Sequence, residues 1–245
     1  MKKLGLIWLL AGLSCLAAGC ASSGKAALLA RRDPIALVSV ISNGDINWKG
    51  EDPIDVATMG PLARRTLRSD PDMVFVTHAE ELIDTAESVF REFMDESMLI
   101  NLAEKGTVLL SQAYQNAQIN RYQASQEQNR ELAKPVGYRL IDFRDKNFPA
   151  ALAAETGIDR FMYLEFNFTK AMATGVGKIG NYKANVEMKV SILNTKGKII
   201  YRRTYVLGSR ITGKVSSGAY SGKELLSLCH ETVIDLCYEF LDHLD

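Results

Sequence analysis

The stretch that decides the fold is Arg160-Phe-Met-Tyr-Leu-Glu-Phe-Asn-Phe-Thr169. Every second position from Met162 to Phe168 is large and apolar, which is the pattern of a β-strand with one buried face. Phe161 and Tyr163 make the start of the other face apolar as well. Strands that are apolar on both faces are typical of the middle of a covered sheet. We therefore predict a central strand over 160–169.

Two more strands are predicted downstream of this one. Residues 183–193 alternate without a break, with apolar side chains at the even positions from Ala184 to Ile192. A four-residue turn, Asn194–Gly197, leads into a strand over 199–207. Strands joined by so short a turn pair in antiparallel fashion. The string Gly175-Val-Gly-Lys-Ile-Gly180 matches a nucleotide-binding pattern, but a strand follows it where that pattern needs a helix, so we interpret it as a loop between antiparallel strands.

The chain before the central strand mixes strands and helices. A β-rich run at 35–42 predicts the first strand, and Asn43-Gly44 predicts a hairpin turn into 45–48. Apolar residues spaced by three and four from Ala79 to Met94 predict an amphipathic helix, with Thr77-His-Ala-Glu80 as its capping box.

The remaining elements are less regular. Gln and Asn crowd residues 107–132, which we interpret as a polar insertion forming a partly docked helix or lid. A strand is predicted at 138–143, and a helix from Asn147 to Glu155 that Gly157 ends. A last helix is predicted over 225–244 behind a second capping box, Ser221-Gly-Lys-Glu224.

The order of these elements sets the fold class. Strands and helices interleave along residues 35–245, and two of the connections between neighbouring strands are short turns. We predict a single α/β (α+β) domain, built as one sandwich of helices on a mixed, largely antiparallel sheet.

The N-terminus has the features of an export signal. Lys2 and Lys3 precede a short apolar run from Leu4 to Leu16, which is shorter than the roughly 20 residues that a spanning helix needs. Small residues and then Cys20 follow. We assign 1–19 to a signal peptide and 20–34 to a tether; a conventional signal cut elsewhere or an uncleaved anchor is the alternative.

Leu16-Ala-Ala-Gly-Cys20 resembles the lipobox of bacterial lipoproteins, apart from Ala17, where that family more often has leucine. The resemblance implies cleavage before Cys20, a diacylglyceryl group on its thiol and an acyl chain such as palmitate on its amine. Ala21 is not the aspartate of the inner-membrane retention signal, which implies an outer-membrane location in the cell envelope. No other cofactor is implied.

Composition excludes one class of function. The chain has 29 Lys and Arg against 29 Asp and Glu, and without Lys2 and Lys3 the remainder is slightly acidic. A nucleic-acid partner is therefore not expected, because such proteins neutralise phosphates with a basic surface.

The sequence nominates no catalytic residue, small-molecule substrate or metal site. Hydrolase and metalloprotease motifs are missing, and His78, His230 and His243 lie far apart. Cys229 and Cys237 sit eight residues apart in one predicted helix, a rise of about 12 Å, which is too far for a disulfide. We interpret both as buried apolar thiols.

Two surfaces are candidates for binding. The first is the polar face of the predicted sheet, for which the plainer interpretation is an ordinary wetted sheet face. Its residues are Lys183, Asn185, Glu187, Lys189 and Arg202. The second is a membrane contact through Arg64, Arg65 and Arg68, helped by the 172–181 loop, which could also meet a partner.

The mature chain resembles small α/β domains of envelope lipoproteins: the curli-secretion channel family, the N-terminal domain of TolB, and the activators of penicillin-binding proteins. The resemblance lies in the lipobox, the segment Gly157–Phe166 and the hairpin at Gly197. It implies a non-enzymatic, periplasm-facing module that binds or assembles an envelope protein. The alternatives are a lipid-interacting outer-membrane lipoprotein and an unrecognised hydrolase.

The lipid anchor predicts how the protein partitions in cells. Cys20→Ala removes the only thiol that the lipobox places at the cleavage site, so the protein should move from the membrane fraction to the soluble fraction. Fractionation of cells that express each variant measures this. Cys15→Ala, within the apolar run, is the control and should leave the protein on the membrane; membrane retention of Cys20→Ala would refute the lipoprotein assignment.

Overall fold

The computed structural model describes residues 33–50, 72–142, 144–176 and 178–244. The predictions for the signal peptide, Cys20, most of the tether, and Arg64, Arg65 and Arg68 lie outside the described residues. The strands are β1 (Ala36–Asn43), β2 (Asn47–Trp48), β3 (Met73–Val74), β4 (Leu132–Ala133), β5 (Arg160–Val176), β6 (Ile179–Asn194), β7 (Ile199–Gly208), β8 (Gly213–Ser216) and β9 (Ala219–Ser221). The helices are α3 (Glu80–Ser97), α4 (Lys105–Leu109), α5 (Gln112–Gln115), α6 (Arg121–Gln128), α7 (Asn147–Thr156) and α8 (Gly222–Leu244).

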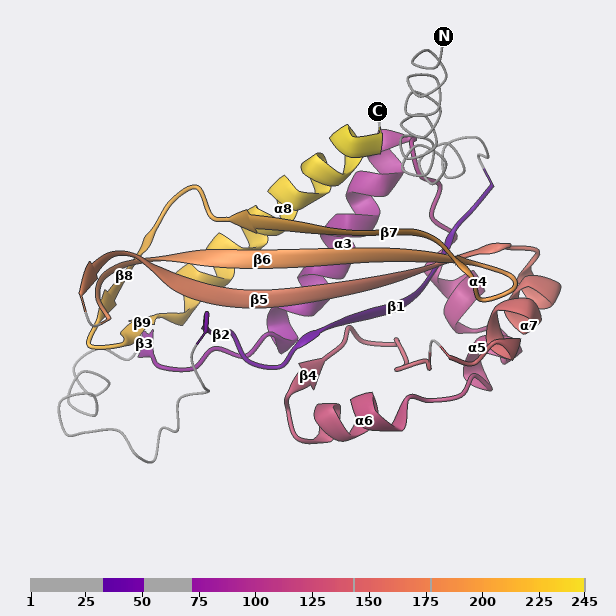
Figure 1. Cartoon of the computed structure of the whole chain (residues 1–245), viewed down its shortest axis with the longest axis horizontal. Coiled ribbons are helices and arrows are strands. Elements are labelled where there is room, and N and C mark those ends of the chain that lie inside the picture. Colours follow the sequence, from indigo (N-terminus) through magenta and orange to yellow (C-terminus); the bar gives the residue numbers. More distant parts are fainter. Residues whose placement is uncertain (1–32, 51–71, 143, 177, 245) are drawn as a thin grey trace, which may run out of the picture.

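These elements form a mixed sheet with helices packed against it, which confirms the predicted fold class (Figure 1). The long β5–β6 hairpin is its spine and pairs from Arg160–Asn194 to Val176–Ile179. β1 and β2 lie parallel to β5 on one side, and β7 and β8 lie antiparallel to β6 on the other. β5 is therefore the central strand that its sequence predicts, although it runs seven residues beyond the predicted end at Thr169.

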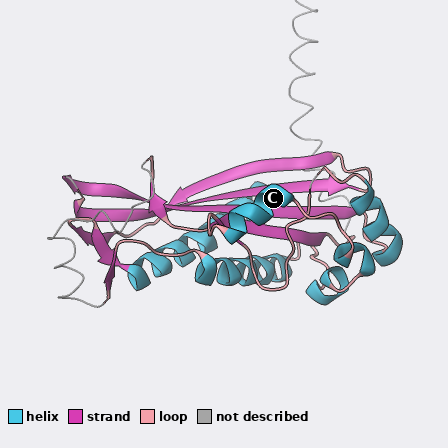
Figure 2. Cartoon of the chain, turned by 90° about the horizontal axis from the view of Figure 1, so that it is seen from below, coloured by secondary structure: helices cyan, strands magenta, loops and turns pink. Residues whose placement is uncertain are grey.

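One face of the sheet, the inner face, carries the main core. The alternating residues Ala184, Val186, Met188, Val190 and Ile192 of β6 are completely buried there. The helices α3 and α8 lie side by side across this face (Figures 1 and 2), and the rings of Phe90 and Phe240 meet 5.9 Å apart between them. Among the described residues, helices cover the other face, the outer face, where β5 begins: the α4, α5 and α7 cluster lies there, and Phe148 packs on Phe161.

Asn43-Gly44 does not form the predicted hairpin, so that prediction is wrong. The Asn43 amide takes the place of a strand backbone: it donates to the Phe168 carbonyl (2.8 Å) and accepts from the Phe168 N–H (2.7 Å). The chain therefore continues beside β5 and reaches β2, which pairs in parallel with Thr169 and Lys170. Gly44 allows the Arg130 carbonyl to approach so closely that a side chain there would collide with it.

The two predicted capping boxes have different outcomes. Helix α3 begins at Glu80 after Ala79 with no side-chain cap, so Thr77 does not cap it. The Thr77 hydroxyl instead donates to the Tyr220 hydroxyl in the core, 3.2 Å away. At α8 the Ser221 hydroxyl accepts from the Glu224 N–H (3.2 Å), which is one half of the predicted box.

The strand predicted at 138–143 is wrong. Residues 138–142 form one isolated bridge, Ile119–Ile141, because side chains and neighbouring loops take up their backbone groups. The Arg139 N–H donates to the Tyr114 hydroxyl (2.9 Å), and the Leu140 carbonyl accepts from the Asn120 N–H (2.8 Å). In contrast, β8 and β9 form from a glycine- and serine-rich segment in which the sequence predicts no strand.

A buried charge cluster ties α3 to α4 and to the 138–142 segment. Glu87 of α3 is 3% exposed and accepts from Arg91, from Lys105 (3.0 Å) and from the Tyr138 hydroxyl (2.8 Å). Burial alone would raise the pKa of Glu87, but these three hydrogen bonds together hold it below its usual value. The carboxylate is therefore the charged centre that joins three separate segments.

Loss of this charge should destabilise the fold. Glu87→Gln leaves Arg91 in a half-buried site without a counter-ion, which typically costs about 3 kcal/mol. Urea unfolding measures the loss, and Glu92→Gln on the exposed face of the same helix is the matched control, expected to be within about 0.5 kcal/mol of the parent.

The same cluster predicts an acid dependence. Because the pKa of Glu87 is lowered in the folded state, its contribution is complete above the unfolded-state pKa and is lost as the pH falls through the folded-state pKa. The stability gap between the parent and Glu87→Gln should therefore shrink in acid. A gap that stays constant from neutral pH to pH 2 would show that Glu87 acts through packing alone.

Candidate docking surface

The outer face of β5 and β6 carries a row of polar cross-strand pairs. The pairing places Glu165 opposite Lys189, Asn167 opposite Glu187, and Thr169 opposite Asn185. Each of these side chains is exposed or partly exposed, while their neighbours on the same strands are buried on the inner face. The strict alternation of the two sequences thus produces a core on one side and a polar surface on the other.

The segment α6–β4 forms a wall along the β1 side of this surface. β4 extends the sheet by pairing with Ser42 and Asn43, and a small apolar cluster of Ile41, Leu132 and Leu140 holds the segment in place. The Asn120 side chain starts α6 by accepting from the N–H groups of residues 122 and 123.

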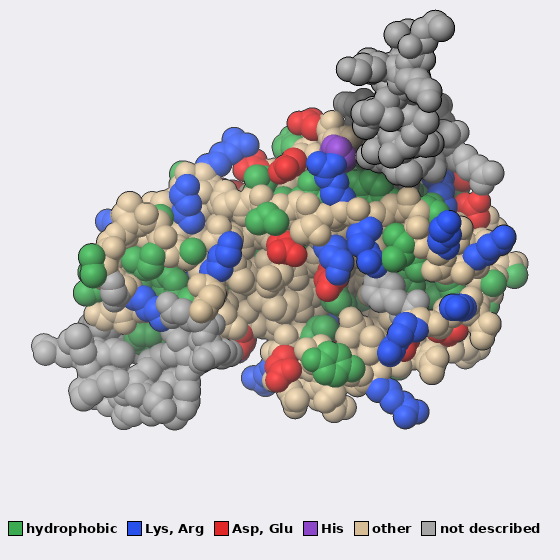
Figure 3. All heavy atoms as spheres, viewed as in Figure 1, with side chains coloured by type: hydrophobic (Ala, Val, Ile, Leu, Met, Phe, Trp, Pro, Cys, Tyr) green, Lys and Arg blue, Asp and Glu red, His purple; other side chains and the backbone are tan. Residues whose placement is uncertain are grey.

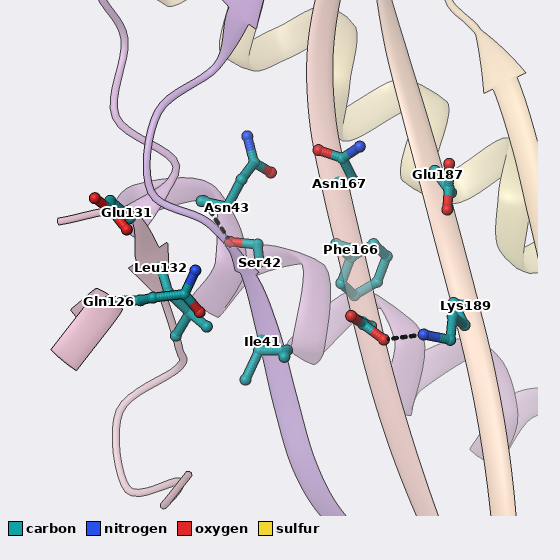
Figure 4. A pocket seen from close by; sticks show the side chains of 11 residues that line it. Ile41, Ser42, Asn43, Gln126, Glu131, Leu132, Phe166, Asn167, Glu187 and Lys189 are labelled. Atoms are coloured by element: carbon teal, nitrogen blue, oxygen red, sulfur yellow. Dashed lines mark hydrogen bonds and ion pairs between the residues drawn. The ribbon is translucent and has the colours of Figure 1, made fainter. Parts of the chain in front are cut away.

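A hollow of about 330 Å³ lies between this wall and the sheet (Figure 4). Gln126, Glu131 and Leu132 line it from the wall, and the sheet supplies its other side. The sheet residues are Ile41, Ser42, Asn43, Glu165, Phe166, Asn167, Glu187 and Lys189. Its lining mixes amides, carboxylates and one amine, a composition suited to hydrogen bonding with a polypeptide.

The charges in the hollow are only partly matched. The Lys189 amine forms an ion pair with Glu165 at 2.6 Å, visible as a dashed line in Figure 4. Glu187 lies two residues before Lys189, on the same face of β6. It has no basic partner among the residues that the structure describes. The hollow thus presents an unneutralised carboxylate beside an ion pair.

The structure brings the predicted partner-surface residues onto one face. Lys183, Asn185, Glu187 and Lys189 follow one another along β6, and Arg202 of β7 joins them by donating to Ser191 across the strand pair (3.3 Å). Basic side chains are spread along this strip in the space-filling view (Figure 3). Only Glu187 and Lys189 of the five reach the hollow.

The wall residues Gln126, Glu131 and Leu132 are the part of the site that sequence reasoning missed. The only sequence signal for them is the Gln- and Asn-rich stretch that we interpret as a lid. Nothing local in that stretch indicates which strand it packs against, because the packing depends on Ile41, more than 80 positions away.

The 172–181 segment is not a separate loop but the tip of the β5–β6 hairpin. Its antiparallel pairing agrees with the rejection of a nucleotide site. Val176 is 86% exposed and Ile179 is 58% exposed, so the tip presents two apolar side chains to solvent.

The remaining chemically active residues form no catalytic cluster in the described ranges. His78 bonds Asp45 (2.7 Å), and Cys229 and Cys237 are free and buried, as predicted. Burial raises the pKa of both thiols to about 12, so they are not reactive at neutral pH. The described residues contain no group of three or more histidine, cysteine or acidic side chains suited to a metal, and no helix among them is long and apolar enough to cross a membrane.

Comparison with known proteins does not identify a family for this chain. No protein-family model matches the sequence, and no curated protein sequence matches it significantly. A solved structure that is similar in part is the C-terminal domain of LpoB from Salmonella enterica, with 10% sequence identity over 71% of this chain and 83% of that chain and a TM-score of 0.24. So loose a superposition carries no argument, and the function of this chain is argued from its own residues.

The ion pair on the outer face should contribute little to stability. Glu165 and Lys189 are each about 40% exposed, and pairs of this kind are worth less than about 1 kcal/mol. Lys189→Ala should therefore keep the melting temperature within a few degrees of the parent in a calorimetric scan. Ala184→Lys, on the buried side of the same strand, should unfold the protein; similar melting temperatures for both variants would contradict the assignment of faces.

Proposed function

We propose that this protein is a lipid-anchored envelope lipoprotein that binds a protein partner through the outer face of its sheet and has no enzymatic activity of its own. The observation that carries the proposal is the hollow between the α6–β4 wall and the polar pairs of β5 and β6. The location rests on the lipobox at Cys20, and an outer-membrane site rests on Ala21.

The described chain begins at the opposite end of β5 from the hairpin tip. The described chain begins at Asp33, whose carbonyl accepts from the Arg160 guanidinium at the start of β5. The hairpin tip at Val176 is 16 residues further along β5, a distance of about 50 Å. A tether that enters at Asp33 therefore joins the domain at the opposite end of the long hairpin from the exposed tip.

A second candidate, contact with lipid, rests on the exposed Val176 and Ile179 at the tip. The tether of residues 21–34 reaches roughly 45 Å when fully extended, so it has length enough to let the domain lie down on the bilayer. Two apolar side chains are a small anchor beside a whole polar sheet face. We therefore rank this candidate second.

The hydrolase alternative gains nothing from the described residues. His78 is bonded to Asp45 on the surface, and the two thiols that could act as nucleophiles are buried with raised pKa values. A nucleophile needs a base within hydrogen-bonding reach and access to substrate. Neither thiol has that access.

Photo-crosslinking in intact cells tests the proposal. A photoreactive residue at position 187 or 167, on the outer face, should capture one discrete protein. The same residue at Glu239, exposed on α8 at the opposite face, is the matched control and should not capture it. Glu187→Lys together with Lys189→Glu should lower capture from position 167 at least about fivefold, because the charge order of the hollow is reversed.

The outcomes separate the candidates. Equal capture from positions 187 and 239 would overturn the outer face as the docking surface. Binding of the purified, non-acylated domain to vesicles of phosphatidylethanolamine and phosphatidylglycerol, with loss on Val176→Ser and Ile179→Ser, would favour the lipid candidate. Absence of both protein capture and vesicle binding would overturn the protein-docking candidate and the lipid candidate.

A further inference from the structure

The two long edges of the sheet differ in whether other described segments bond to their backbone groups. Along β1 the backbone groups at the edge are taken up by neighbours: the Ile35 N–H donates to the Asn101 carbonyl (2.8 Å), and the Val38 carbonyl accepts from the Tyr114 hydroxyl (3.1 Å). β4 then pairs with the end of β1. This edge is closed by the protein's own segments.

The opposite edge is open. β7 pairs with β6 from Ile199 to Gly208, and no other described strand pairs with it. The neighbouring β8, by contrast, is continued by β9 and β3. In an antiparallel pair every second residue turns its N–H and C=O away from the partner strand, so the ten residues of β7 carry a ladder of such groups that no other described strand takes up.

The stretch of sequence that contains the open edge is basic, although Lys189, Arg210 and Lys223 within it form ion pairs with Glu165, Asp235 and Asp72. The 36 residues from Met188 to Lys223 contain eight Lys and Arg and no Asp or Glu. Two of these side chains, Arg202 and Arg203, lie in the middle of β7 and are exposed. Neither has a carboxylate partner within the described part of the chain: Arg202 bonds Ser191, and Arg203 bonds His243 (2.8 Å).

We infer that β7 is a docking edge for an extended acidic segment of a protein partner, which adds to the sheet as a further strand. Backbone hydrogen bonds to the open ladder would supply affinity, and the arginines would select acidic side chains. The inference rests on the proposed function and deepens it, because Arg202, Thr204 and Val206 continue the outer face to this edge.

A second copy of this chain is a poor occupant of the same edge. When two β7 strands pair in antiparallel fashion about their middle, Arg203 of one copy lies opposite Thr204 of the other and diagonal to its Arg202. Like charges that face each other across strands are destabilising, and basic side chains are a known means by which edge strands avoid self-association. The charge pattern thus excludes a copy of itself and admits an acidic strand.

Synthetic peptides test the inference on the purified, non-acylated chain. The probe is a fluorescent ten-residue peptide of alternating Glu and Val, and the comparison peptide alternates Lys and Val. The Glu peptide should bind at least about tenfold more tightly than the Lys peptide, and its binding should weaken with salt. A Glu peptide that is N-methylated at alternate residues on the pairing edge keeps its charge and should not bind.

Two further measurements locate the peptide. Hydrogen exchange should slow at alternate amides of β7 and leave β4 unchanged. Arg202→Glu with Thr204→Glu should lower affinity at least about tenfold. Arg121→Glu with Gln128→Glu makes the same change in charge on exposed positions of α6 and should not.

Each contrary outcome overturns the inference. These outcomes are no saturable binding of the Glu peptide at millimolar concentration, equal binding of the Lys or N-methylated peptide, protection of amides outside β7, or a dimer in sedimentation that Arg202→Glu with Thr204→Glu dissociates, which would place a second copy on this edge. If crosslinking from position 187 still captures a protein in that case, the proposed function stands and only strand addition falls.

Discussion

The register of the β5–β6 hairpin is the constraint on which the rest of the structure depends. Because side chains alternate between faces, a slip of one residue would send Leu164 and Val190 to solvent and Glu165 and Lys189 into the core. The cost of such a slip falls on every pair of the hairpin at once. The pairing that builds the core under α3 and α8 therefore also fixes which side chains stand on the outer face and in what order.

A second consequence is that the outer face stays open in its middle. Aromatic residues at its start, such as Phe161, require cover, and the α4, α5 and α7 cluster provides it. Beyond Tyr163 the outward residues are polar, so no helix is needed there. On β1, Ile41 is an apolar residue that points to the outer face. It packs against Leu132 and Leu140, and this contact holds the α6–β4 wall beside the polar row. The contact of Ile41 with Leu132 and Leu140, together with the pairing of β4 with β1, thus holds the wall that forms one side of the hollow.

Local periodicity was enough to predict the strands β5, β6 and β7 and the helices α3, α7 and α8, since each buries one face in a regular repeat. It failed where distant contacts decide the conformation. The Asn43 amide pairs with Phe168, Thr77 bonds Tyr220, and Gly213 is required because a side chain there would overlap the Tyr182 ring. None of these contacts has a local signature, so the hairpin at Asn43 and the cap at Thr77 are predicted wrongly, and β8 is not predicted at all. The outward residues of β6 follow from alternation alone, whereas the wall that faces them does not.

The outer face of β5 and β6 carries fewer folding constraints than the inner face. The inner face cannot change without loss of packing, and Glu87 cannot change without stranding Arg91. The Glu165–Lys189 pair, in contrast, lies half in solvent, where an ion pair adds little to stability.

Side chains that contribute little to folding can vary to suit a partner at small cost, provided that the backbone beneath them is rigid. Here that backbone is a long hairpin held in register by its buried side, and the strand next to it, β7, pairs with β6 on one side only among the described strands. A rigid polar platform with one open edge is suited to recognising an extended segment of another protein.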